Sequence, residues 1–114
     1  MSDLAERDFE KAADATLHAL DRALSDESDF EVELTMGILT LEFPDGTKYV
    51  VNSHRAARQI WMAADRAAWH FDLAGDRWVA TKSGDELVGT LESVVSRKLG
   101  RPWAVGRPGA PGRP

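Results

Sequence analysis

Residues 30–52, FEVELTMGILTLEFPDGTKYVVN, decide the fold of this chain. Apolar and polar residues alternate through 30–36 and again through 39–43, and a period of two is typical of half-buried β-strands. Pro44-Asp45-Gly46 then marks a turn into a third run over 47–52. Because parallel strands need long crossover connections, strands joined this closely must be antiparallel.

The first of these strands has one apolar face and one acidic face. We predict that its apolar residues are buried, namely Phe30, Val32, Leu34 and Met36. The residues between them, Glu31, Glu33 and Thr35, should face solvent.

Three more runs extend the sheet, over 58–63, 69–73 and 77–81. In the first of them the aliphatic residues 60 and 62 should point into the core, which leaves Trp61 and Gln59 on the open face of the sheet. Asn52 and His70, on neighbouring strands, should share that face. A tryptophan in this position is typical of an interaction surface. Alternatively, it lies flat on its neighbours as a packing cap.

Helical periodicity marks the two ends of the folded chain. From Asp3 to Leu24 an apolar stripe recurs at 3.6-residue spacing, and Asp3 with Glu6 resembles a capping box. The opposite face of this helix carries Glu10, Asp14, His18 and Asp21. A second helix should begin at the capping box Ser83–Glu86 and end at Gly100. Its apolar stripe comprises Leu87, Leu91, Val94, Val95 and Leu99.

The predicted fold class is therefore α+β: a two-layer α-β sandwich. The N- and C-terminal helices pack on one face of a roughly six-stranded antiparallel sheet. The domain should span residues 1–105. Trp103 and Val105 would cover the groove where the helices meet, and the basic, Pro- and Gly-rich tail over 106–114 is predicted to be disordered.

Composition excludes several classes of function. The 114 residues contain no cysteine, so disulfides, thiolate–zinc sites and cysteine-ligated clusters are ruled out. No apolar run approaches the ~18 residues of a membrane span, and the N-terminus carries no signal pattern, so we expect a cytoplasmic protein without a membrane partner. The motifs H-E-x-x-H, G-x-S-x-G and G-x-x-x-x-G-K are all missing, and no enzyme is predicted.

The net charge of −5 is unevenly distributed. Residues 1–33 carry eleven acids against three bases, a net of −8. Residues 34–96 carry eight acids and six bases, a net of −2, and residues 97–114 carry five bases and no acid, a net of +5. The acidic front end repels phosphates, which argues against a nucleic-acid partner. It favours metal cations or a basic protein surface.

The acids are most crowded in DRALSDESDFEVE, residues 21–33, where six of thirteen side chains are carboxylates. Like charges so close together reduce stability. One explanation is simply a solvated face. The other is a surface that binds a cation or a basic partner.

The run VVNSHRAARQIWMAADRAAWHFDLAGDRW, residues 50–78, resembles the signature of the frataxin family in its bacterial, CyaY-type branch. The matching elements are N-x-x-x-x-x-x-Q-I-W-[ML]-A, an aromatic-His-Phe-Asp-Leu strand and G-D-x-W. The upstream segment GILTLEF-x-DG matches another strand of the family, and the likeness extends from about Phe9 to Leu99. The chain departs from many bacterial relatives at Ala67-Ala68, where they have Gly-Gly, and at His54, where they tend to have Gln.

The resemblance implies an α-β sandwich that takes part in iron–sulfur cluster assembly. It implies weak binding of iron, as Fe²⁺ and Fe³⁺, by an acidic ridge on the first helix and first strand. The ridge would comprise Asp14, Asp21, Asp26, Glu27, Asp29, Glu31 and Glu33. The family also contacts the cysteine desulfurase and the iron–sulfur scaffold protein, through a sheet surface that would comprise Asn52, Gln59, Trp61 and His70.

Iron ions accept carboxylate oxygen readily. Carboxylates spread along one helix face and one strand are splayed, so each ion would meet one or two side chains plus water, and binding would be weak and exchangeable. His18 lies beside Asp14 and Asp21 on the helix and would add a nitrogen ligand, unless it is simply a surface residue. Paired E-x-x-H motifs of a di-iron centre are missing. A weak ferroxidase activity has been proposed for relatives, and it is the one catalytic activity that we would test.

We therefore predict an iron-binding accessory protein of iron–sulfur cluster assembly, monomeric without iron. It would act as an iron donor, as an iron-dependent regulator of the desulfurase–scaffold complex, or as both. The alternative is an acidic interaction module that docks a basic partner without binding iron physiologically. An acidic mimic of nucleic acid is a third interpretation.

Overall fold

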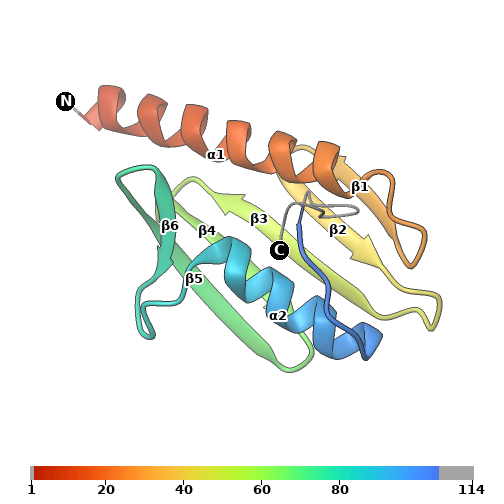
Figure 1. Cartoon of the computed structure of the whole chain (residues 1–114). Helices are drawn as coiled ribbons and strands as arrows, with labels where there is room; N and C mark the ends of the chain where they lie inside the picture. The colour runs from red at the N-terminus through yellow and green to blue at the C-terminus, as the bar shows by residue number, and fades with distance from the viewer. Residues whose placement is uncertain (1, 106–114) are drawn as a thin grey trace.

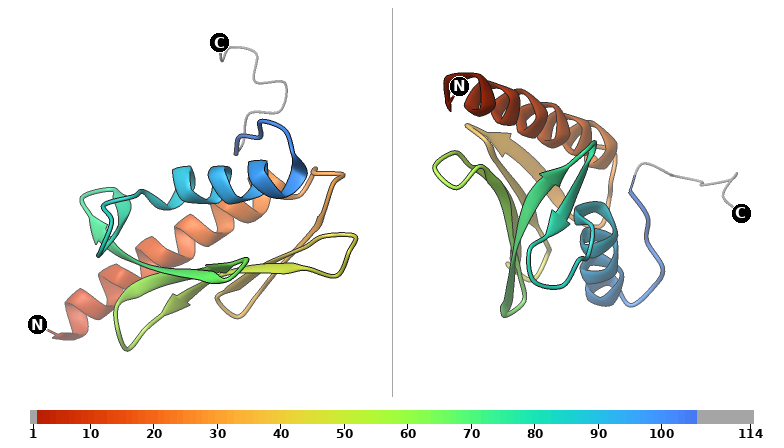
Figure 2. Two further views of the ribbon diagram at one scale, coloured as in Figure 1. Left: turned by 90° about the horizontal axis from the view of Figure 1, so that it is seen from below. Right: turned by 90° about the vertical axis from the view of Figure 1, so that its left-hand side faces the viewer.

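The computed structural model describes residues 2–105, with side chains from residue 7 onward. Two helices and six strands follow the chain in the order α1 (Ser2–Leu24), β1 (Glu31–Thr35), β2 (Ile38–Glu42), β3 (Lys48–His54), β4 (Gln59–Ala64), β5 (Ala67–Ala74), β6 (Arg77–Ala80) and α2 (Leu87–Leu99). The strands form one antiparallel sheet in sequence order, with β1 and β6 at its edges. Both helices lie on the same face of that sheet (Figures 1 and 2), which confirms the predicted two-layer sandwich.

The apolar stripe of α1 is buried as its spacing predicts. Its members are at most 5% exposed, and they are Phe9, Ala13, Leu17, Leu20 and Leu24. The stripe also reaches the far edge strand, because the Trp78 indole N–H of β6 donates to Thr16 Oγ1 at 2.9 Å and the Trp78 ring meets Phe9 edge-on. The predicted capping box at residues 3 and 6 lies outside the side chains that the structure describes.

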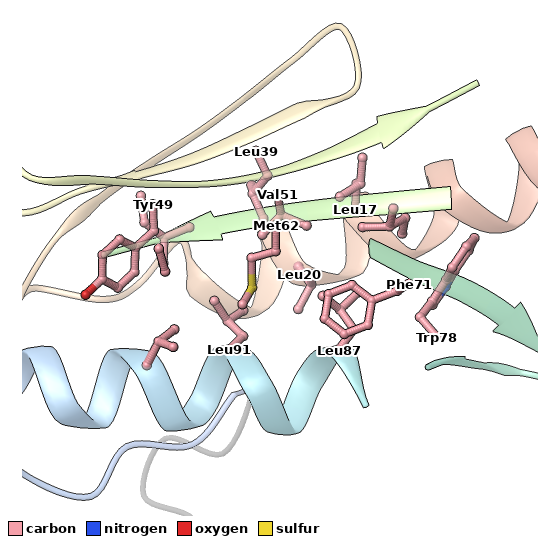
Figure 3. Close-up of a cluster of buried hydrophobic side chains, with 14 of the residues drawn as sticks. Leu17, Leu20, Leu39, Tyr49, Val51, Met62, Phe71, Trp78, Leu87 and Leu91 are labelled. Atoms are coloured by element: carbon pink, nitrogen blue, oxygen red, sulfur yellow. The ribbon is translucent and has the colours of Figure 1, made fainter. Parts of the chain in front are cut away.

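The core fills the space between the helices and the inner face of the sheet (Figure 3). Ile60 and Met62 point into it, as predicted, and are at most 1% exposed. Tyr49 is also fully buried, and its hydroxyl donates to Asp65 Oδ1 at 2.7 Å. Burial raises the pKa of Tyr49 above its ordinary value, and the hydrogen bond to Asp65 raises it further. A buried phenol is thus held neutral and paired.

The start of α2 differs from the prediction. The helix begins at Leu87, and the Ser83 hydroxyl bonds Asp85 instead of capping the helix. Residue 79 forms a bridge with Glu86, so the chain stays extended along the edge of β6 until the helix starts. Gly100 ends the helix in the left-handed conformation (φ 74°), as predicted.

The segment after α2 turns back along that helix (Figure 1). Trp103 is half-buried and its ring packs on Phe30, with 5.8 Å between ring centroids. The backbone N–H of Trp103 donates to Ser96 Oγ at 2.9 Å, and Val105 N donates to Glu92 Oε2 at 3.0 Å. Residues 103 and 105 thus lie against the core, as expected, whereas the predicted disordered tail over 106–114 lies outside the described residues.

The turn between β1 and β2 corrects one prediction. Met36 was expected on the buried side of the first strand, but it lies in the turn and is 94% exposed. Met36 and Gly37 both have positive φ, 51° and 79°, which is the geometry of the tight hairpin turns that match strand twist. The strand ends at Thr35 because the chain must reverse there for residue 38 to pair with residue 35. A left-handed conformation costs a methionine about 1 kcal/mol.

One ion pair ties the β2–β3 turn to α2. Lys98 Nζ donates to Asp45 Oδ2 at 2.6 Å, and Asp45 Oδ1 accepts the Thr47 N–H at 2.9 Å. The lysine contact, followed by the Thr47 hydrogen bond, lowers the pKa of Asp45 well below its ordinary value of 3.8. Because the folded pKa is depressed, the pair contributes stability above pH 3.8 and loses it as the pH falls through the folded pKa.

Asp45→Asn should therefore lower the melting temperature at neutral pH, since the amide keeps an acceptor for Thr47 but loses the charge. The difference from wild type should shrink as the pH falls below 3.8. Thermal unfolding followed by circular dichroism over a pH series measures this, with Asp76→Asn in the exposed β5–β6 turn as the control. A difference that is independent of pH would contradict the assignment.

Candidate functional site

The predicted acidic ridge lies where α1 passes into β1, at one edge of the sheet (Figure 1). Its members come from the exposed face of α1, the α1–β1 connection and β1, and they are Asp14, His18, Asp21, Asp26, Glu27, Asp29, Glu31 and Glu33. All are at least partly exposed to solvent. The ridge therefore runs from α1 through the connection into β1, and each of its side chains reaches solvent at least in part.

The helical part of the ridge is held by local contacts. His18 Nδ1 lies 2.9 Å from the Asp14 carbonyl oxygen and 3.4 Å from Asp14 Oδ1, one turn earlier on the helix. Both side chains are more than half exposed. Asp21 is half-buried and lies one turn further along α1. These groups follow the helix axis and do not converge on one point.

The strand part of the ridge gains a residue that the sequence did not suggest. Glu31 lies directly opposite Glu42 in the β1–β2 register. Like charges in that position destabilise a sheet. Lys48, the β3 partner of Glu42, brings a base into the same row. Glu33 accepts a hydrogen bond from the Thr35 hydroxyl at 3.2 Å. Only the register could have added Glu42 to the ridge, because it lies outside the acidic run over 21–33.

Two ridge carboxylates are paired with residues that follow α2, so the ridge is not open over its whole length. Arg101 forms an ion pair with Asp29 and lies 4.0 Å from Glu27 Oε2. The Trp103 indole N–H donates to Glu27 Oε1 at 2.8 Å. We call residues 101–105 the C-terminal strap. It brings a cation and an indole donor onto the middle of the ridge, between Asp26 and the carboxylates of β1.

The ridge provides no closed metal cage. Within residues 7–105 no three His, Asp or Glu side chains are grouped closely enough to hold one ion. This geometry agrees with the splayed arrangement inferred from the sequence. A cation on this surface would keep most of its water, exchange readily and meet one or two carboxylates at a time.

The predicted contact surface comes together on the open face of the sheet, which Glu31 and Glu33 of the ridge share. Asn52, Gln59, Trp61 and His70 form what we call the open-face cluster. Trp61 is paired with Asn52 of β3 and with His70 of β5 in the sheet register. These four residues alternate with the buried residues of β3, β4 and β5, so they lie on the opposite face of the sheet. Neither helix covers that face (Figure 2).

The Trp61 ring stands between two imidazole rings in this cluster. Its ring stacks on His54 at 3.8 Å and on His70 at 4.3 Å, with interplanar angles of 15° and 16°. The indole N–H donates to Gln59 Oε1 at 2.9 Å, and Gln59 Nε2 donates to Asp72 Oδ1 at 3.1 Å. Both flat faces of the indole are therefore covered by imidazoles, and a partner would meet its edge together with the two outer rings.

His54 and Asp72 belong to this surface but were not assigned to it from the sequence. Asp72 lies two residues after His70, and a period of two places both on one face of β5. His54 stood out only as a departure from the family pattern. Its stacking role depends on the β3–β4 register, in which it is paired with Gln59.

Comparison with known proteins identifies the fold and the family. The α-β sandwich with an acidic edge and an aromatic open face superposes on frataxin from Psychromonas ingrahamii with a TM-score of 0.79, at 23% identity over 87% of this chain and 95% of that one. Yeast frataxin is 32% identical, with a TM-score of 0.68 and 82% of each chain covered. A trimeric frataxin from Saccharomyces cerevisiae, complexed with ferrous iron, is 30% identical, with a TM-score of 0.62 over 82% of this chain and 86% of that one.

The frataxin-like domain model matches residues 2–101, and the chain belongs to the frataxin family. The resemblance drawn from residues 50–78 is thus confirmed. Family membership supports an iron-related role in iron–sulfur cluster assembly. Among the described residues, neither helix is long and apolar enough to cross a membrane.

Arg101→Ala should free Glu27 and Asp29 of their internal cation. We expect the variant to bind divalent cations roughly two- to fivefold more tightly, as for the loss of a competing exposed ion pair, and to melt at a lower temperature. Calorimetric titration with Mn²⁺ measures the affinity. Arg97→Ala is the matched control, since it removes the same charge from the end of α2, where the arginine lies 3.9 Å from Asp65, away from the ridge. Equal affinities of both variants would show that the strap does not compete with cations.

Proposed function

We propose that this protein is an iron-binding accessory protein of iron–sulfur cluster assembly. In this proposal it supplies iron to the cysteine desulfurase–scaffold complex, regulates that complex according to iron level, or does both. The observation that carries the proposal is the exposed acidic ridge, without a closed cage, on a chain of the frataxin family. A protein that stores iron would need converging ligands, whereas a donor or sensor needs readily exchanged ions.

The exposed carboxylates are the groups proposed to meet iron first. Asp26, Glu31 and Glu33 are exposed, and the last two project from an edge strand. The yeast frataxin complexed with ferrous iron, 30% identical to this chain, supports the choice of ion. Glu27 and Asp29 would join only when the strap releases them.

The proposed partner surfaces are the open-face cluster and the acidic ridge beside it. A negative edge steers a basic protein surface and raises its association rate, most strongly at low salt. Trp61, half-buried and held by three neighbours, is preorganised for contact, so little rotamer freedom is lost on docking. Iron and a basic partner would compete for the same carboxylates, which would couple iron level to partner binding.

We propose a monomer in the absence of iron, located in the cytoplasm. The proposal assigns no catalytic residue. Oxidation of ferrous iron in the presence and absence of the protein tests the remaining possibility of a weak ferroxidase activity.

Asp26→Asn combined with Glu31→Gln should bind Fe²⁺ more weakly, by roughly fivefold for each lost carboxylate. The same variant should melt at a higher temperature, because the Glu31–Glu42 repulsion is relieved. Anaerobic NMR titration with Fe²⁺ should broaden ridge resonances of wild type selectively. Asp76→Asn on the β5–β6 turn serves as the control and should change neither property. Indifference of the wild-type ridge resonances to Fe²⁺ would favour the interaction module without iron.

That second candidate is favoured by one observation, the ordered stack around Trp61, which needs no metal. Trp61→Ala should weaken binding to the purified cysteine desulfurase–scaffold complex by at least about thirtyfold, as for a hot-spot side chain. Val88→Ala, a truncation of a half-buried side chain on α2, is the control and should leave binding unchanged. Surface plasmon resonance measures both. Equal binding by both variants would mean that the open face is not the docking surface.

A further inference from the structure

The turn between β1 and β2 contains a residue that is unfavourable for folding in two ways. Met36 adopts φ 51°, and non-glycine residues other than Asn and Asp rarely take this left-handed conformation. Its side chain is also 94% exposed, the largest exposure among the large hydrophobic residues described. Asn-Gly is the pair that such turns prefer. Methionine at position 36 is therefore unfavourable both for the backbone conformation and for the exposure of an apolar side chain to water.

The turn around Met36 has little freedom to avoid this conformation. Gly37 follows with φ 79°, and a Cβ there would lie 2.9 Å from Ser53 Oγ. The Gly37 carbonyl accepts the Ser53 N–H at 3.0 Å, which fixes the turn to β3. The backbone thus holds Met36 outward in a defined position, and the side chain is presented to solvent by a rigid support.

Met36 lies in the turn beside a row of residues that crosses the open face, and Thr35 of β1 is paired with Ile38 at the near end of that row. In the sheet register, Ile38 of β2 is paired with Asn52, Asn52 with Trp61, and Trp61 with His70. Ile38 is 44% exposed, so it continues the apolar surface from the turn toward the cluster. The turn and the cluster are therefore two parts of one surface.

The strands that carry the turn are acidic. Glu31 and Glu33 project from the open face of β1, and Glu42 lies beside Glu31 on β2. A second copy of this chain would bring the same carboxylates against each other, and the net charge of −8 over residues 1–33 disfavours that contact. Anionic phosphate surfaces are repelled for the same reason. The charge pattern selects a protein with a basic surface.

We propose that Met36, together with Ile38, is an anchor that enters an apolar pocket with a basic rim on the partner protein that covers the open face. This inference rests on the proposed function, because it concerns the partner that docks there. An unbranched thioether adapts to irregular apolar pockets, and single side chains that fill such pockets dominate many interfaces. The acids of β1 and β2 would pair with the rim while Met36 fills the pocket.

The first test separates folding from binding by one substitution. Met36→Asn should raise the melting temperature, because asparagine tolerates the left-handed conformation. It should also weaken binding to the purified cysteine desulfurase–scaffold complex by at least about fivefold. Met36→Leu keeps an apolar side chain and should bind within about twofold of wild type. Fe²⁺ binding, followed by NMR, should be unchanged in both variants.

The second test needs no variant. Hydrogen peroxide transfers one oxygen atom to a methionine thioether, which gives the sulfoxide and water. Met36 should be oxidised rapidly in the free protein, whereas Met62, 1% exposed, should react slowly and serves as the internal reference. Addition of the desulfurase–scaffold complex should protect Met36, as measured by peptide mass spectrometry.

The outcomes distinguish this inference from the function on which it rests. If Met36→Asn binds like wild type and Met36 stays reactive in the complex, the anchor is wrong, although loss of binding in Trp61→Ala would still support the docking face. If wild type itself does not bind the complex, the proposed function and the anchor both fail. If Met36→Leu loses as much affinity as Met36→Asn, an apolar pocket is excluded.

Discussion

Burial of a single face of the sheet by both helices is the constraint from which the other features follow. The inward side chains of β2, β3 and β4 are almost completely removed from water, and they include Leu39, Val51 and Ile60. Because the side-chain period of a strand is two, every buried residue places its neighbours on the opposite face. The open face is therefore a necessary product of the core, and its side chains are available for contacts that folding does not need.

Repulsion between the ridge carboxylates reduces the stability that the core provides. The carboxylates of α1 and β1 are placed together by the direct passage of the helix into an edge strand, and Glu31 faces Glu42 without an intervening base. The strap compensates part of this repulsion, since Arg101 lies against Asp29 and Glu27. The strap lies far from the ridge in the sequence. The same short segment therefore neutralises ridge carboxylates, packs Trp103 against the core and limits access to the ridge.

On the open face, polar and aromatic side chains are held in place by contacts with one another, although none of them belongs to the core. Trp61 is fixed by two imidazoles and one amide. Met36 is fixed by its backbone at a tip of the same surface. Rigid presentation of large side chains reduces the entropy lost on association. The ridge carboxylates, by contrast, do not converge on one point within the described residues.

The amino-acid sequence by itself determined the elements, the sandwich and the faces of most residues, because periods of 2 and 3.6 assign each side chain to a side. It also predicted the ridge and the open-face cluster as candidate sites. Only the tertiary structure placed Glu42 in the ridge, put Arg101 on Asp29 and moved Met36 from a buried strand position into a turn. These features depend on strand register and on contacts between residues far apart in the chain, and local periodicity contains no information about either.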